Sequence, residues 1–156
     1  MGFSLLELLL VLSLVAVLGS LGVGSMSPGG AALTAVQGEL RASLEQAILL
    51  ARTQGRDVRV VLGGPGPGDI QPLVLPLGVR WGLPPGMPSP PWIPGAAQAR
   101  MIGWAHACSI VTPRHTAEAN VWFLTDGRDG VCLRLNDEAR ITLLRRRHGA
   151  SRWRKV

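Results

Sequence analysis

The sequence lacks the residue patterns on which most enzyme active sites and metal centres depend. Its 156 residues include only two cysteines, Cys108 and Cys132, which are too few for a zinc site and too far apart for a redox Cys-x-x-Cys pair. The histidines His106, His115 and His148 have no metal-ligand spacing among themselves or with the cysteines. No phosphate-binding glycine loop, dinucleotide fingerprint or nucleophile elbow is present. The sequence therefore predicts a protein that is not an enzyme and holds no metal or cofactor.

An excess of basic charge is also missing from most of the chain. The formal net charge is +6, yet residues 139–156 hold seven basic side chains and no acid, while the other 138 residues hold nine basic and ten acidic side chains. The basic character therefore belongs to a C-terminal tail. Its members are Arg140, Arg145, Arg146, Arg147, Arg152, Arg154 and Lys155.

The chain begins with a long apolar run. Residues 3–23 have the sequence FSLLELLLVLSLVAVLGSLGV, with a single charge at Glu7. As a helix they would rise about 31 Å, enough to cross the hydrocarbon core of a bilayer. Such a run is typical of a cleaved secretory signal, a plain membrane anchor or a helix that assembles with others.

Glu7 discriminates among these three interpretations. A carboxylate inside an apolar helix costs about 2.5–3.5 kcal/mol on insertion, so it requires a partner, and a plain anchor has no use for it. A secretory signal carries a basic segment before its apolar run, and none precedes this one. The small residues Gly22 and Gly24 resemble a signal cleavage site, which keeps that alternative open.

Residues 2–12, GFSLLELLLVL, resemble the class III signal of type IV prepilins and pseudopilins. The resemblance implies that a prepilin peptidase cuts between Gly2 and Phe3 and methylates the new amine of Phe3. It also implies that Glu7 pairs with the Phe3 amine of a neighbouring subunit, because two buried opposite charges offset each other's cost. Family leaders carry a basic residue before the glycine, whereas only Met1 precedes Gly2 here, so processing is implied by the resemblance alone.

The rest of the chain divides into a break and one domain. Residues 1–2 are the residual leader and 3–24 the membrane and assembly helix. Glycines and Pro28 make 25–33 a flexible break, and 34–156 form a periplasmic domain. From Thr34 an apolar stripe at three- and four-residue steps predicts a core-facing helix that ends near Gly55. The stripe is Leu33, Val36, Leu40, Leu44, Ala47 and Ala51.

Strands are expected at 58–62 and, as a C-terminal meander, at 107–112, 119–124, 130–135 and 139–145. The segments ELRASLEQAILLARTQGRDVRVVL and NVWFLTDGRDGVCLRL resemble parts of pseudopilins of the GspH/FimT type. Asp126 and Asp129 are expected to form a hairpin turn rather than a calcium site.

Residues 63–95 hold ten of the twelve prolines and eight glycines. They predict an extended surface loop, with short edge strands at 73–75 and 77–81. A proline-rich ligand for another domain is the alternative.

Two features leave alternatives open. Cys108 and Cys132 form either one disulfide, if the domain lies outside the cytoplasm, or two buried thiols. The tail is either a solvated or lipid-facing charged end or a DNA-binding element. In that second case Arg forks hold phosphates and Trp153 stacks on a base. Residues 151–154, SRWR, resemble the Gly-Arg-x-Arg tail of FimT-like minor pilins, with Ser151 in place of the glycine.

Together these observations predict an α+β, type IV pilin-like fold: a long N-terminal helix, its first half transmembrane, packed on a small antiparallel sheet. The function implied by the resemblance is that of a GspH-like minor pseudopilin, single-pass in the bacterial inner membrane. Its partners would be other pseudopilins, the prepilin peptidase and the inner-membrane assembly platform of a type II secretion system. The alternative is a FimT-like minor pilin of a type IV pilus whose partner is DNA, taken up for natural transformation.

Overall fold

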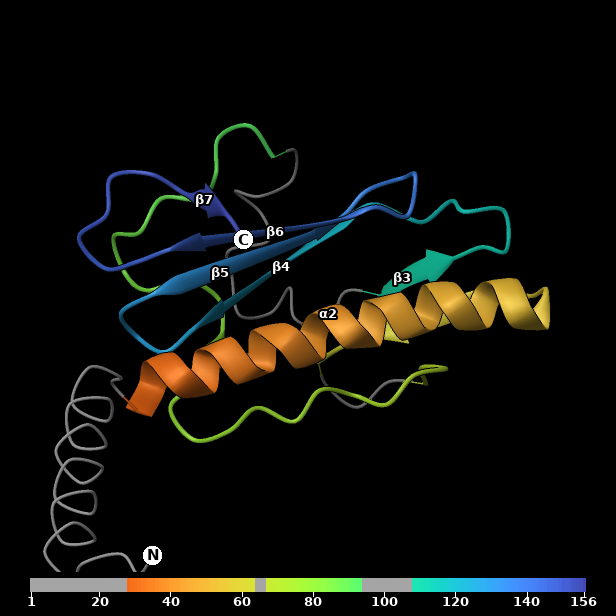
Figure 1. Cartoon of the computed structure of the whole chain (residues 1–156), viewed down its shortest axis with the longest axis horizontal. Coiled ribbons are helices and arrows are strands. Elements are labelled where there is room, and N and C mark those ends of the chain that lie inside the picture. The colour runs from red at the N-terminus through yellow and green to blue at the C-terminus, as the bar shows by residue number, and fades with distance from the viewer. Residues whose placement is uncertain (1–27, 64–66, 94–107) are drawn as a thin grey trace, which may run out of the picture.

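The computed structural model describes residues 28–63, 67–93 and 108–156 and is shown in Figure 1. Its elements are helix α2 (Pro28–Gln54) and strands β1 (Val58–Val61), β2 (Arg80–Trp81), β3 (Cys108–Val111), β4 (Asn120–Thr125), β5 (Gly130–Leu135), β6 (Ile141–Arg146) and β7 (Arg154–Lys155). All strand pairs are antiparallel. They make a two-stranded sheet, β1-β3, and a five-stranded sheet in the order β2-β4-β5-β6-β7.

Helix α2 follows the predicted apolar stripe. All six stripe residues are buried, and the helix ends at Gly55, whose φ of +63° a residue with a side chain adopts only with strain. The helix starts six residues before Thr34, so the predicted break over 25–33 is wrong for residues 28–33. Pro28 is tolerated there because the first helical N–H needs no partner within the helix. A Cβ on Gly29 would lie 3.3 Å from the Asp126 Cβ, so a glycine lets the helix approach the β4–β5 turn closely.

The predicted fold class is wrong in two respects. In the part of the chain that the structure describes, no helix is long and apolar enough to cross a bilayer, because charged side chains line the exposed side of α2. The segment 3–24, predicted to be the membrane helix, lies outside the described residues. The seven strands also form two sheets rather than one small sheet. After β3 the chain folds back, with Glu118 N–H donating to the Ile110 carbonyl, so β4 starts a separate sheet.

Both faces of the five-stranded sheet are covered. One face packs on α2 through Trp122, Leu124, Val131, Leu133, Leu135 and Leu143. The other face carries a second buried cluster of Val121, Phe123, Cys132, Leu144, Trp153, Met87 and Ile93. Figure 1 shows α2 along one side of the strands and the segment around residues 83–93 on the other. Every residue of β4 is buried as a result.

The proline-rich stretch is therefore more than the predicted surface loop. Met87 and Ile93 are buried against the sheet, and the Trp153 indole Nε1 donates a hydrogen bond of 3.0 Å to the Pro88 carbonyl. Of the two expected edge strands in this stretch, only the second appears, as β2, which pairs with β4. The strands predicted at 58–62 and in the C-terminal meander are confirmed within one or two residues at their ends, and β7 was not predicted.

Candidate anion-binding groove

The period-two alternation of β6 sends the neighbouring arginines Arg145 and Arg146 to opposite faces of the sheet. The residues two positions before them, Leu143 and Leu144, pack in the helix-side and loop-side clusters respectively. Consecutive tail arginines therefore serve different surroundings.

Arg145 is committed to holding the domain together. One terminal nitrogen donates to Asp129 Oδ2 at 3.0 Å, and the other donates to the Thr34 Oγ1 on α2 at 2.8 Å. Both side chains of the ion pair are largely sheltered, with 19% and 18% of their areas exposed. Arg145 therefore links α2 to the β4–β5 turn, and it is not available to a ligand.

Arg146 projects from the opposite face and is held at one atom. Its Nε donates to the Ala150 carbonyl at 2.9 Å. Within the described residues its two terminal nitrogens have no hydrogen-bond partner. The guanidinium group is thus oriented while most of its donors remain free.

A tight turn over residues 147–150 follows β6. Ala150 N–H donates to the Arg147 carbonyl at 3.0 Å, and Gly149 has φ +75°, as the third residue of a type II turn requires. His148 N–H donates to Asp129 Oδ1 at 2.9 Å. Asp129 therefore fixes both Arg145 and the backbone of this turn.

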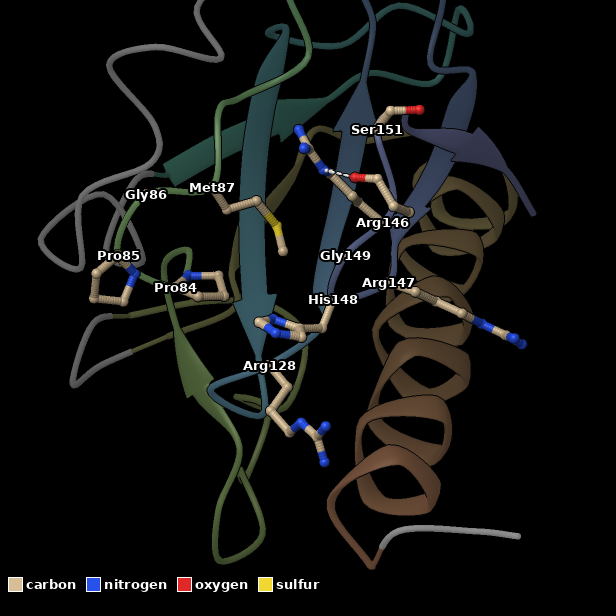
Figure 2. Close-up of a pocket in the computed structure, with 11 residues that line it drawn as sticks. Pro84, Pro85, Gly86, Met87, Arg128, Arg146, Arg147, His148, Gly149 and Ser151 are labelled. Atoms are coloured by element: carbon tan, nitrogen blue, oxygen red, sulfur yellow. Dashed lines mark hydrogen bonds between the residues drawn. The ribbon is translucent and has the colours of Figure 1, made fainter.

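A hollow of about 360 Å³ lies between this turn and the proline-rich segment. We call it the groove; it is lined by Pro84, Pro85, Gly86, Met87, Arg128, Arg146, Arg147, His148, Gly149, Ala150 and Ser151. In Figure 2 the His148 ring faces toward Pro84, while Arg128 and Arg147 extend outward from the rim. Three lining residues are arginines and none is acidic, so the groove is a site of positive potential that suits an anion.

The structure brings together only part of the predicted DNA-binding set. Arg146 and Arg147 line the groove, whereas Arg152, Arg154 and Lys155 are exposed outside its lining. Trp153 is 7% exposed and its ring packs near Phe123, with ring centroids 6.2 Å apart. The predicted stacking of Trp153 on a base is therefore wrong, because the ring belongs to the core.

Sequence reasoning did not find the other residues of the groove. Arg128 comes from the β4–β5 turn and the Pro84–Met87 wall from the proline-rich segment, both distant in the chain from the tail. Only the register of β4, β5 and β6 brings them together.

The two cysteines are free thiols, so the disulfide alternative is not the one the structure supports. They lie in different sheets: Cys108 in β3, where its Sγ accepts from Arg59 Nε at 3.1 Å, and Cys132 in β5 within the loop-side cluster. Burial raises the pKa of the Cys132 thiol to about 12.

The predicted Asp126–Asp129 turn is confirmed. Asp126 Oδ1 accepts from the backbone N–H groups of Arg128 and Asp129 at 2.9 and 2.7 Å. Across residues 28–63, 67–93 and 108–156, no group of three or more potential ligands is placed to hold a metal ion. His106 and the leader residues Gly2, Phe3 and Glu7 lie outside these ranges.

Comparison with known proteins does not add an identity to this geometry. No family model, curated protein or solved structure matches the chain.

Proposed function

We propose that the chain is a structural minor subunit of a type II secretion pseudopilus, anchored in the bacterial inner membrane by residues 3–24. The observation that carries the proposal is the single carboxylate of Glu7 inside an otherwise apolar run that follows Gly2-Phe3. A buried carboxylate needs a buried cation, and the Phe3 amine of a neighbouring subunit is the cation that the leader resemblance supplies. The protein would act by assembly with other pseudopilins.

The described domain is compatible with this role in one respect. Helix α2 begins at Pro28, so only a few residues separate it from the proposed anchor. The domain would then lie close to the outer surface of the inner membrane, in the periplasm. No groove residue is needed for this function, which rests on the leader.

Processing and assembly of the full chain test the proposal. In cells that make an active prepilin peptidase and assembly platform, mass spectrometry is expected to find a mature chain that begins at N-methylated Phe3. Glu7→Gln should be processed but fail to enter filaments, because the neighbour's amine loses its partner. Glu39→Gln, an exposed site on α2, is the matched control and should assemble normally. An intact Gly2–Phe3 bond in such cells would contradict the proposal.

A second candidate function is DNA binding by a minor pilin during natural transformation. The observation that favours it is the groove, in which three arginines and a histidine gather without an acid. Exposed Arg152 and Arg154 lie close by in the chain and could add phosphate contacts. Binding of DNA by the full chain in detergent should then weaken steeply with salt, as displacement of counterions from phosphates requires. If the chain ignores DNA at about 50 mM salt, this candidate fails and the filament proposal is unaffected.

A further inference from the structure

We propose that the groove is the site where this chain binds the phosphodiester backbone of nucleic acid, with Arg146 and His148 as inner contacts and Arg128 and Arg147 as rim contacts. The inference rests on the second candidate function and moves its site from the exposed tail to the groove. The arrangement of these four side chains carries the argument (Figure 2).

Arg146 is the best prepared of the four to hold a phosphate. Its Nε bond to the Ala150 carbonyl fixes the plane of the guanidinium group, and its terminal nitrogens are left with donors to offer. A planar fork matches two phosphate oxygens at once. Because the side chain is already held, little rotamer freedom is lost when the ligand binds.

His148 is presented by a turn that is fixed at its backbone. The His148 N–H bond to Asp129 and the Ala150 bond to Arg147 set the direction of the ring. An imidazole offers at least one N–H donor in either protonation state, so it can bond a phosphate oxygen at neutral pH. The nearest acid, Asp129, is occupied by Arg145 and by this backbone N–H, so it does not compete as a local anion.

The opposite wall limits what can enter. Pro84 and Pro85 have fixed φ angles, and Met87 is buried against the sheet, so this wall is stiff and carries no charge. The volume of about 360 Å³ accommodates a single phosphate with its sugar, not the width of a duplex. One backbone unit would therefore enter while the rest of the strand runs outside.

The rim arginines favour a chain of phosphates over a single head group. Arg128 and Arg147 come from different turns and extend outward from the hollow in different directions (Figure 2). A lone phosphate between Arg146 and His148 would leave both rim cations unused. Neighbouring phosphates of a strand that passes through the groove would meet one on each side.

The test measures binding of a fluorescent single-stranded 20-mer to the full chain in detergent micelles across a salt series. Arg128→Ala/Arg147→Ala should weaken binding about tenfold or more at low salt and reduce the slope of log Kd against log salt by about 2, one for each lost phosphate contact. The matched control, Arg52→Ala/Arg114→Ala, removes the same charge from exposed sites outside the groove and should change Kd less than about twofold. Arg146→Lys keeps the charge but loses the fork, and should also weaken binding.

Three results would overturn the inference. If the control double variant weakens binding as much as the rim variant, only overall charge matters. If Arg152→Ala/Arg154→Ala abolishes binding while the rim and Arg146 variants bind as the parent chain does, the tail is the site. If vesicles rich in phosphatidylglycerol compete fully with the oligonucleotide and the rim variant loses vesicle binding equally, the groove is a lipid head-group site. Circular dichroism of each variant checks that the domain remains folded, and mapping of the Gly2–Phe3 cut in the same samples tests the filament proposal separately.

Discussion

Asp69 shows how one side chain completes the outer edge of a strand. Its Oδ2 accepts from Arg59 N–H at 2.7 Å, its Oδ1 accepts from Arg56 Nη1 at 2.8 Å, and its own N–H donates to the Arg59 carbonyl at 2.8 Å. The backbone N–H of Arg59, and after it the Arg56 side chain, lower the pKa of this carboxyl. Strand β1 pairs on one side with β3, and Asp69 serves the other side at Arg59.

That lowered pKa sets a sign for the effect of pH. A carboxyl with a lower pKa in the folded state stabilises the fold above its ordinary pKa, and this contribution is lost as pH falls through the folded value. Asp69→Asn should therefore lower Tm at pH 7, and the difference in Tm from the parent chain should shrink as pH falls below about 4. Thermal unfolding of both proteins from pH 7 to pH 2.5 measures it. A constant difference across that range would show that the charge of Asp69 is not what matters.

The two thiols should differ in reactivity. Cys108 is half-buried, whereas Cys132 is fully buried and its pKa is raised to about 12 by that burial, so its reactive thiolate is scarce. Iodoacetamide at pH 8 is expected to label Cys108 in the folded protein and to reach Cys132 only in denaturant. Mass spectrometry of the labelled peptides checks this. If neither thiol is labelled in denaturant until a reductant is added, the two are joined as a disulfide.

Two glycines make opposite predictions at the scale of the element. Gly38 lies in α2, and a Cβ added there would have no neighbouring atom within 4 Å, so Gly38→Ala should stabilise the protein by about 0.5–1 kcal/mol through helix propensity. In β5, a Cβ on Gly130 would lie 2.6 Å from Met87 Sδ and 2.9 Å from Leu83 Cδ2. Gly130→Ala should therefore cost about 1–3 kcal/mol, because the proline-rich segment must move.

Urea unfolding of the two variants beside the parent chain measures both effects. Equal destabilisation by both substitutions would mean that the loss of glycine flexibility, rather than the local space, decides the result.

The elements themselves were largely predictable, but their grouping was not. The stripe from Leu33 to Ala51 and the alternating runs of the meander specify a helix and strands through local periodicity. The division into two sheets depends on the return of the chain from Ile110 to Glu118, a hydrogen-bonding choice with no periodic signature. The continuous apolar run of β4, NVWFLT, was the available sign that both faces of the sheet are covered.

The groove was predictable only in part, for the same reason. The excess of arginine after residue 139 indicated a basic site. Composition cannot tell that Arg145 turns to α2 and Arg146 to the groove, because that depends on which face of β6 is inward. The buried position of Trp153 depends on the partner that Pro88 provides from 65 residues away.

At the scale of the whole molecule, the proline-rich segment acts as a third layer held by Trp153. Trp153→Ala should cost about 3–5 kcal/mol, because a large buried ring and its hydrogen bond to Pro88 are lost. Residues 83–93 should then become accessible to proteases, which limited proteolysis with mass mapping detects. Trp92→Ala is the control, since that ring is 57% exposed and should change stability by less than about 0.5 kcal/mol. Equal losses from both substitutions would contradict the layered arrangement.

The order of elements along the chain also determines when the core can form. Strands β4, β5 and β6 join neighbours through short turns, whereas the apolar stripe of α2 packs on strands that follow it by about seventy residues or more. Local hairpins close quickly, and contacts between distant segments form slowly. During synthesis α2 must therefore wait, its stripe uncovered, until the last strands leave the ribosome. A chain arrested before residue 120 would present that stripe without the sheet that covers it.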